Sequence, residues 1–147
     1  MITLYTIGFT KKNAERFFSL LKENGVKQLV DVRINNSSQL AGFAKGKDLE
    51  YFVKEICHIP YIHIADFAPT KELLDQWHKQ EVTWDEYERI YTKMLAERDI
   101  LRKYGVKLFD GSCFLCSEDT PEQCHRRLLA EYMKKHSKDQ VQIIHLI

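Results

Sequence analysis

The chain lacks an excess of charge of either sign. Its 22 lysine and arginine residues face 21 aspartate and glutamate residues, so the formal net charge is +1. This balance provides no overall positive field that would attract nucleic acid, although a local group of basic residues can still bind an anion. Nucleic acid is therefore not the partner that the composition favours.

Long hydrophobic runs are also absent. No 18 consecutive residues are apolar, and the N-terminal MITLYTIGF lacks the basic segment and long apolar stretch of a secretory signal. The four cysteines are consequently expected to be reduced thiols rather than a disulfide framework. These features predict a cytoplasmic protein with no membrane partner.

The chain has no internal repeat, linker or low-complexity segment, and its 147 residues suit one α/β domain over 1–147. Apolar β-type segments alternate with helical patterns, which is typical of a parallel sheet covered by helices. We predict a three-layer Rossmann-like sandwich with helices on both faces and about five strands. The predicted strands are 2–9, 26–33, 59–64, 114–117 and 141–147, with a short extended segment at 106–109.

Cap residues mark the predicted helices. Asp48 is expected to cap one helix and Thr70 the next, while Thr83 and Glu86 have the spacing of a capping box. That box opens a longer helix predicted to end at Gly105. The polar stretch 34–47, which follows the second strand, is long enough to be a functional loop.

The last helix is predicted to begin at Pro121, with Thr120 as its cap. Cys124 then lies about one turn inside, where the free backbone amides favour a thiolate or a bound anion. Spacing of about 100° per residue turns His125 toward the sheet, with Arg126 beside it and Arg127 in solvent.

Cys113 and Cys116 resemble a redox or zinc pair, but their odd spacing in a strand points them to opposite faces. A zinc site from Cys116, Cys124 and His125 would need a fourth ligand, and neighbouring side chains diverge in a helix. We therefore predict no metal and no cofactor, and keep zinc as a minor alternative.

Several short motifs follow one another along the chain. They are Thr6-Ile-Gly-Phe9, Asp31-Val-Arg33, Tyr61 with His63, Leu115-Cys-Ser-Glu118, Cys124-His-Arg126 and His145-Leu. In their order and spacing the chain resembles the uncharacterised family called domain of unknown function 488. The resemblance implies a small three-layer α/β protein, in a family without an established general activity. This chain departs from the commoner family pattern at 34–37 and 65–70, two loops expected to border the site.

Because the carboxyl ends of parallel strands meet at one edge, the motif residues are expected to converge there. An anion such as phosphate, sulfate or carboxylate would bind two arginines and a helix start. The predicted ligand-binding residues are Thr6, Gly8, Asp31, Arg33, Arg126 and His145.

The thiols supply the predicted chemistry. Cys124 is the predicted nucleophile beside Cys116, with His125 and Glu118 for proton transfer. His125 also suits a hydrogen-bonded core position, and Glu118 a structural ion pair with Arg33 or Arg126. The sequence thus favours an enzyme or binding domain for a small anionic or nucleotide-like ligand. The alternative is a nucleic-acid-binding or protein-interaction module without catalysis.

Overall fold

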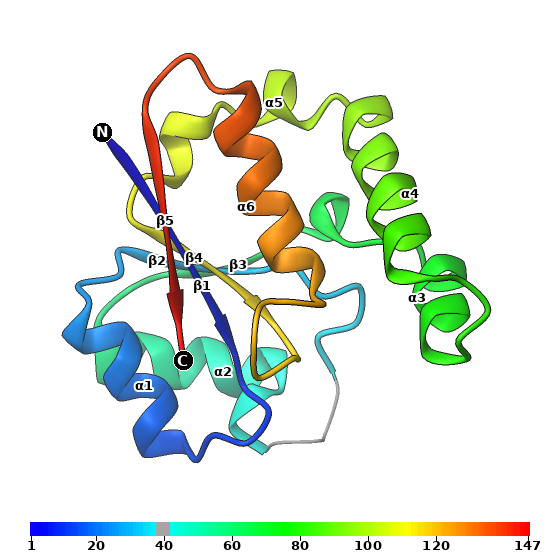
Figure 1. Cartoon of the computed structure of the whole chain (residues 1–147). Coiled ribbons are helices and arrows are strands. Elements are labelled where there is room, and N and C mark those ends of the chain that lie inside the picture. Colours follow the sequence, from blue (N-terminus) through cyan, green and yellow to red (C-terminus); the bar gives the residue numbers. More distant parts are fainter. Residues whose placement is uncertain (38–41) are drawn as a thin grey trace.

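The computed structural model describes residues 1–37 and 42–147, and within them five parallel strands form one sheet (Figure 1). Its order is β3-β2-β4-β1-β5. The strands are β1 (Ile2–Gly8), β2 (Gln28–Asp31), β3 (Tyr61–His63), β4 (Ser112–Cys116) and β5 (Val141–Leu146). Because every pair is parallel, all five strands end at the same edge. The predicted functional loop includes 38–41, which lie outside the described residues.

Helices cover both faces of the sheet, which confirms the predicted three-layer α/β architecture (Figure 1). One face packs against α1 (Ala14–Glu23), α2 (Gly46–Phe52) and the π-helical turn η2 (Val53–Cys57). The other packs against α6 (His125–His136), with α3 (Lys71–His78) and α4 (Trp84–Glu97) outside it. No helix in the described part of the chain is both long and apolar enough to span a bilayer.

Alternating side chains of β4 supply both hydrophobic layers. Phe114 and Cys116 belong to the cluster beneath α6, whereas Cys113 and Leu115 belong to the cluster beneath α1. This is the period of two that a strand imposes. The prediction that Cys113 and Cys116 point to opposite faces is confirmed.

Three predicted helix boundaries are wrong, although Thr70 and Thr83 cap α3 and α4 as expected. The residue preceding α2 is Lys45 rather than Asp48, because Gly46 packs against Asn36 and donates its amide to the Asn36 carbonyl at 2.7 Å. The helix predicted to reach Gly105 breaks at Asp99, whose φ of 53° is left-handed. A separate turn, α5 (Ile100–Lys103), follows.

The segment Val106–Phe109 is a 3-10 turn and not the predicted extended segment. The correction with most consequence for function concerns α6, which begins at His125 with Cys124 as the N-cap residue instead of Thr120. Residues 117–123 form a loop because arginine side chains capture its carbonyls. Arg126 Nη1 donates to the Glu118 carbonyl at 2.7 Å, and Arg127 Nη2 to that of Glu122 at 2.8 Å.

Candidate functional site

A cavity of about 370 Å³ lies at the edge where β1, β2 and β4 end. This volume and position are typical of small-molecule sites in open parallel sheets. The residues that line it come from the strand ends, the loop after β4, α3, α4 and the start of α6. They are Thr10, Arg33, Ile34, Asn35, Leu74, Trp77, His78, Tyr87, Cys116, Ser117, Glu118, Gln123, Cys124 and His125.

Arg33 is the buried cation of this cavity. Its Nε and Nη2 donate to the two carboxylate oxygens of Asp31 at 2.9 and 2.7 Å, and Nη2 also donates to the Ala44 carbonyl at 2.7 Å. The guanidinium lies 5.3 Å from the centre of the Phe9 ring, within range of a cation–π contact. Its Nη1 is buried and has no hydrogen-bond partner among residues 1–37 and 42–147. Arg33 is therefore fixed in place with one donor unused.

Asp31 is a positioning residue for Arg33. Besides the guanidinium, its carboxylate accepts a hydrogen bond of 2.6 Å from the Tyr61 hydroxyl, and Asn36 donates to the same hydroxyl at 3.1 Å. Burial and the Asp31 carboxylate raise the pKa of Tyr61, so the phenol stays protonated and donates. His63 Nε2 donates to the Arg33 carbonyl at 2.6 Å. The network occupies Asp31 fully, and Asp31 does not line the cavity.

Three potential metal ligands, Cys116, Cys124 and His125, lie opposite on the α6 side. Their Sγ, Sγ and ring nitrogen atoms lie within 4.8 Å of one another, and all three side chains are buried. His125 Nε2 lies 2.7 Å from the Val32 carbonyl, and Nδ1 lies 3.5 Å from Cys116 Sγ. A carbonyl only accepts, so Nε2 carries a hydrogen, and Cys116 Sγ lies almost as close to Nε2, at 3.9 Å, as to Nδ1.

The two thiols of this cluster differ in character. Donation from the Cys124 thiol, from the amides of Ser117 and Glu118, and the charge of Arg126 lower the pKa of Cys116 against the effect of burial. Burial and the neighbouring Cys116 raise the pKa of Cys124 well above its usual value. The predicted thiolate at Cys124 depended on a helix that begins at Pro121, whereas α6 begins at His125. The thiol with the lowered pKa is that of Cys116.

Gly8 and Arg126 hold the loop after β4 without lining the cavity. A Cβ on Gly8 would overlap the Glu118 carbonyl, so only glycine lets this loop cross β1. Arg126 donates to the same carbonyl, and its buried Nε is unpaired. Among the described residues, Glu118 forms no ion pair with Arg33 or Arg126. Arg126 bonds to the backbone carbonyl of Glu118, and the Glu118 side chain is exposed.

Thr6 and His145 are paired neighbours on β1 and β5, and neither lines the cavity. The Thr6 hydroxyl and His145 Nδ1 share a hydrogen bond of 2.6 Å. Burial, aided by the charge of Arg126, lowers the pKa of His145 and keeps the ring neutral. The strand ends thus bring the predicted residues into one region, but only Arg33, Cys116, Glu118, Cys124 and His125 border the cavity.

The sequence did not identify the apolar wall. Leu74, Trp77 and Tyr87 form it, and Trp84 stacks on Tyr87 at 4.9 Å between ring centres. Tyr87 also belongs to the core cluster beneath α6. The residue that could have indicated this wall is Trp77 on α3, a large aromatic side chain that stays partly exposed. Of the two unusual loops, 34–37 contributes to the lining and 65–70 does not.

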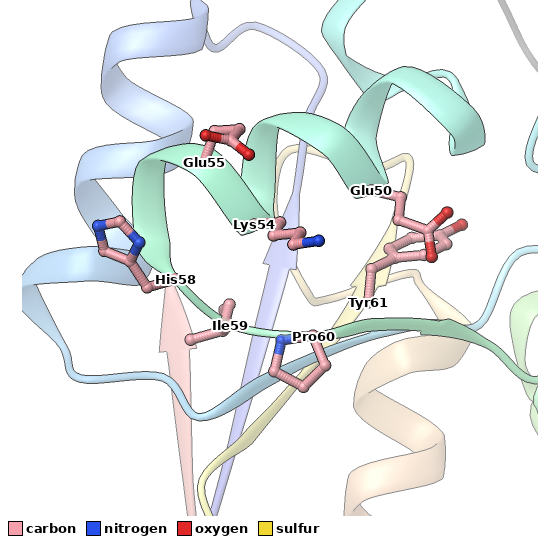
Figure 2. Close-up of a pocket in the computed structure, with 7 residues that line it drawn as sticks. All are labelled: Glu50, Lys54, Glu55, His58, Ile59, Pro60 and Tyr61. Carbon is pink, nitrogen blue, oxygen red and sulfur yellow. The ribbon is translucent and has the colours of Figure 1, made fainter.

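A second hollow, of about 580 Å³, lies beside η2 and the start of β3 (Figure 2). Its charged side chains Glu50, Lys54 and Glu55 are exposed, so water satisfies them. Among the described residues it contains no buried side-chain donor or acceptor without a partner. The chemical groups gather instead at the carboxyl edge of the sheet.

Fold and site together define an α/β protein with a parallel sheet, whose carboxyl edge carries a buried arginine and a Cys-Cys-His cluster. The chain belongs to the family described as Domain of unknown function DUF488, whose sequence model matches residues 13–133. The motifs at Thr6–Phe9 and His145 lie outside this match. No curated protein and no solved structure is significantly similar to the chain.

Proposed function

We propose that the protein binds a small anionic, nucleotide-like ligand in the cavity at the carboxyl edge of the sheet, and that it acts on this ligand in a thiol-dependent reaction. The observation that carries the proposal is the unpartnered Nη1 of Arg33, buried in a guanidinium that lines the cavity. A buried donor without a partner costs about 1–3 kcal/mol, which an oxygen of a bound anion would recover.

The surroundings of Arg33 favour an oxyanion as the occupant. Asp31 already balances the positive charge, so affinity depends on a directed hydrogen bond more than on net attraction. Phosphate, sulfate and carboxylate oxygens accept such bonds from a fixed guanidinium. The rigid Asp31–Tyr61 support means that little side-chain entropy is lost when the ligand binds.

The opposite wall suits an apolar or planar group. Leu74, Trp77 and Tyr87 offer hydrophobic and aromatic surface within the same 370 Å³ cavity. Aromatic faces stack on flat rings, including nucleobases, at about 1–3 kcal/mol per base. A ligand with an oxyanion at one end and a flat body at the other matches both walls.

Cys116 is the thiol we assign to the reaction in place of Cys124, because its surroundings lower the pKa of Cys116, whereas burial raises the pKa of Cys124. His125 is held by the Val32 carbonyl, and its ring lies beside that sulfur, with Nδ1 at 3.5 Å. Glu118 stands exposed at the cavity wall, where a carboxylate can exchange protons with solvent. Proton transfer at the site is therefore assigned to these two residues.

The test is calorimetric titration of the full chain with inorganic phosphate and adenosine monophosphate, using Arg33→Lys. Lysine keeps a cation beside Asp31 but cannot supply the second nitrogen donor, so affinity is expected to fall about 10-fold or more. Arg102→Lys is the matched control, since Arg102 is exposed and pairs with Asp99 away from the cavity. Equal affinity in Arg33→Lys and wild type, or binding of neither anion, would refute the proposal.

A further inference from the structure

We propose that Cys116, Cys124 and His125 form a zinc site with three protein ligands, whose fourth position faces the cavity. This deepens the proposed function, on which it rests only for the role of the open position: with zinc bound, Cys116 and His125 act as ligands and proton transfer is left to Glu118. In this assignment the thiol dependence of the site is that of a metal centre. Binding of Zn²⁺ releases the thiol protons to solvent, because only thiolates ligate the ion.

The spacing of the donor atoms fits tetrahedral zinc. Bonds of about 2.3 Å to sulfur and 2.0–2.1 Å to nitrogen place two such ligands about 3.6 Å apart. Cys116 Sγ and His125 Nδ1 are separated by 3.5 Å, and all three donor atoms lie within 4.8 Å of one another. The three donor atoms are therefore close enough to share one ion once the side chains of Cys116, Cys124 and His125 turn toward it.

The orientation of His125 is that of a metal ligand. Histidines that bind metals usually donate their second ring N–H to a carboxylate or backbone carbonyl, which fixes the tautomer. Here Nε2 donates to the Val32 carbonyl at 2.7 Å, and Cys116 Sγ lies beside the ring, 3.5 Å from Nδ1 and 3.9 Å from Nε2. The carbonyl comes from the end of the neighbouring strand, so the sheet itself sets the direction of the ring.

The start of α6 removes the objection that neighbouring helical side chains diverge. Cys124 precedes the helix with extended angles, φ −140° and ψ 140°, and His125 is the first helical residue. The change of backbone conformation between them brings the two side chains together. Both then face Cys116 at the end of β4.

The donor set favours zinc over hard cations. Two thiolates and one imidazole are soft or borderline ligands, whereas magnesium and calcium prefer oxygen. Two thiolates also neutralise Zn²⁺, which suits a buried place. Cys113 lies on the other face of β4, and no fourth ligand joins the cluster within 1–37 and 42–147. Three protein ligands and an open position are typical of catalytic zinc.

Spectroscopy with cobalt tests the site directly. The full chain, reduced and freed of metal with a chelator, is titrated with Co²⁺, which reports tetrahedral thiolate ligation by visible d–d and near-ultraviolet charge-transfer bands. We expect one ion per chain and displacement of the cobalt by Zn²⁺. Cys116→Ala and Cys124→Ala should lose the charge-transfer band in steps and weaken binding by more than the roughly 10- to 100-fold typical of outer partners.

Cys113→Ala is the matched control, because it removes a buried thiol from the same strand on the opposite face. A control that weakens cobalt binding as much as Cys116→Ala does would overturn the proposal, as would wild type that gives no tetrahedral bands. Should an alanine variant fail to fold, wild type alone decides. Zinc should slow alkylation of Cys116 and Cys124 but not of the half-buried Cys57, and equal rates with and without zinc would overturn it.

The two proposals fail separately. Arg33→Lys should keep cobalt binding, since Arg33 is not among the ligands, while it loses phosphate affinity. Cobalt binding without any phosphate binding would refute the anion site alone. Phosphate binding that depends on Arg33 in a chain that never binds cobalt or zinc would refute the metal site alone.

Discussion

Arg33 and Arg126 are two buried guanidiniums at the same edge of the sheet, with exposed fractions of 4% and 0%. In the part of the chain that the structure describes, each has one buried nitrogen without a partner, Nη1 of Arg33 and Nε of Arg126. Arg33 is paired with a carboxylate and lines the cavity, whereas Arg126 donates to the Glu118 and Asp119 carbonyls. A buried arginine thus has two roles here, since one is presented to a ligand and the other shapes a loop.

Removal of the carboxylate that pairs with Arg33 should have the largest effect. Asp31→Asn should leave a buried cation uncompensated and lower the free energy of unfolding by about 3–5 kcal/mol. Urea denaturation followed by circular dichroism measures this loss. Adding Arg33→Gln to Asp31→Asn should recover part of the loss, because the pair is then removed together. If Asp31→Asn alone were as stable as wild type, Asp31 would not be what holds Arg33.

Arg126 is expected to matter for the loop. Arg126→Met should leave the Glu118 carbonyl unsatisfied and lower the free energy of unfolding by about 2–3 kcal/mol. Hydrogen exchange should locate the loosening at 117–123. Arg127→Met, on a partly exposed neighbour, should cost less than about 1 kcal/mol. If Arg126→Met instead abolishes anion binding in a chain that is still folded and stable, the two arginines share one role.

The smallest expected effect concerns pH. Because burial and Arg126 lower the pKa of His145 in the folded chain, protonation favours the unfolded state. The contribution of His145 is present above its unfolded pKa of about 6.5 and is lost as pH falls through the folded value. Urea midpoints between pH 7.5 and 5 should decline less steeply in His145→Gln. Identical slopes in the two proteins would contradict this account.

The alternation of β-type and helical segments allowed the parallel sheet and its layers to be predicted from the sequence. The alternation of side chains within a strand predicted the opposite directions of Cys113 and Cys116. The start of α6 could not be predicted, because Thr120 and Pro121 are good local signals that the side chains of Arg126 and Arg127 override. The break at Asp99 has no glycine to mark it. Such features depend on contacts that local propensity does not contain.

Within the site, the sequence grouped the right strand ends but could not assign roles. Arg33 and Arg126 are the same residue type in comparable motifs, and only three-dimensional packing separates the one at the cavity from the one behind it. The apolar wall from Leu74, Trp77 and Tyr87 depends on how α3 and α4 pack against α6, which helical periodicity does not specify. The extended backbone of Cys124 could not be predicted either, because it depends on α6 beginning at His125 and not at Pro121.

The central claim is that the free nitrogen of Arg33 is the anion donor. A crystal structure with selenate, located by the anomalous scattering of selenium, tests it most directly. We predict one selenate in the cavity with an oxygen about 2.9 Å from Arg33 Nη1. Selenate found only at Arg126, only in the hollow beside η2, or nowhere on the chain would contradict the claim.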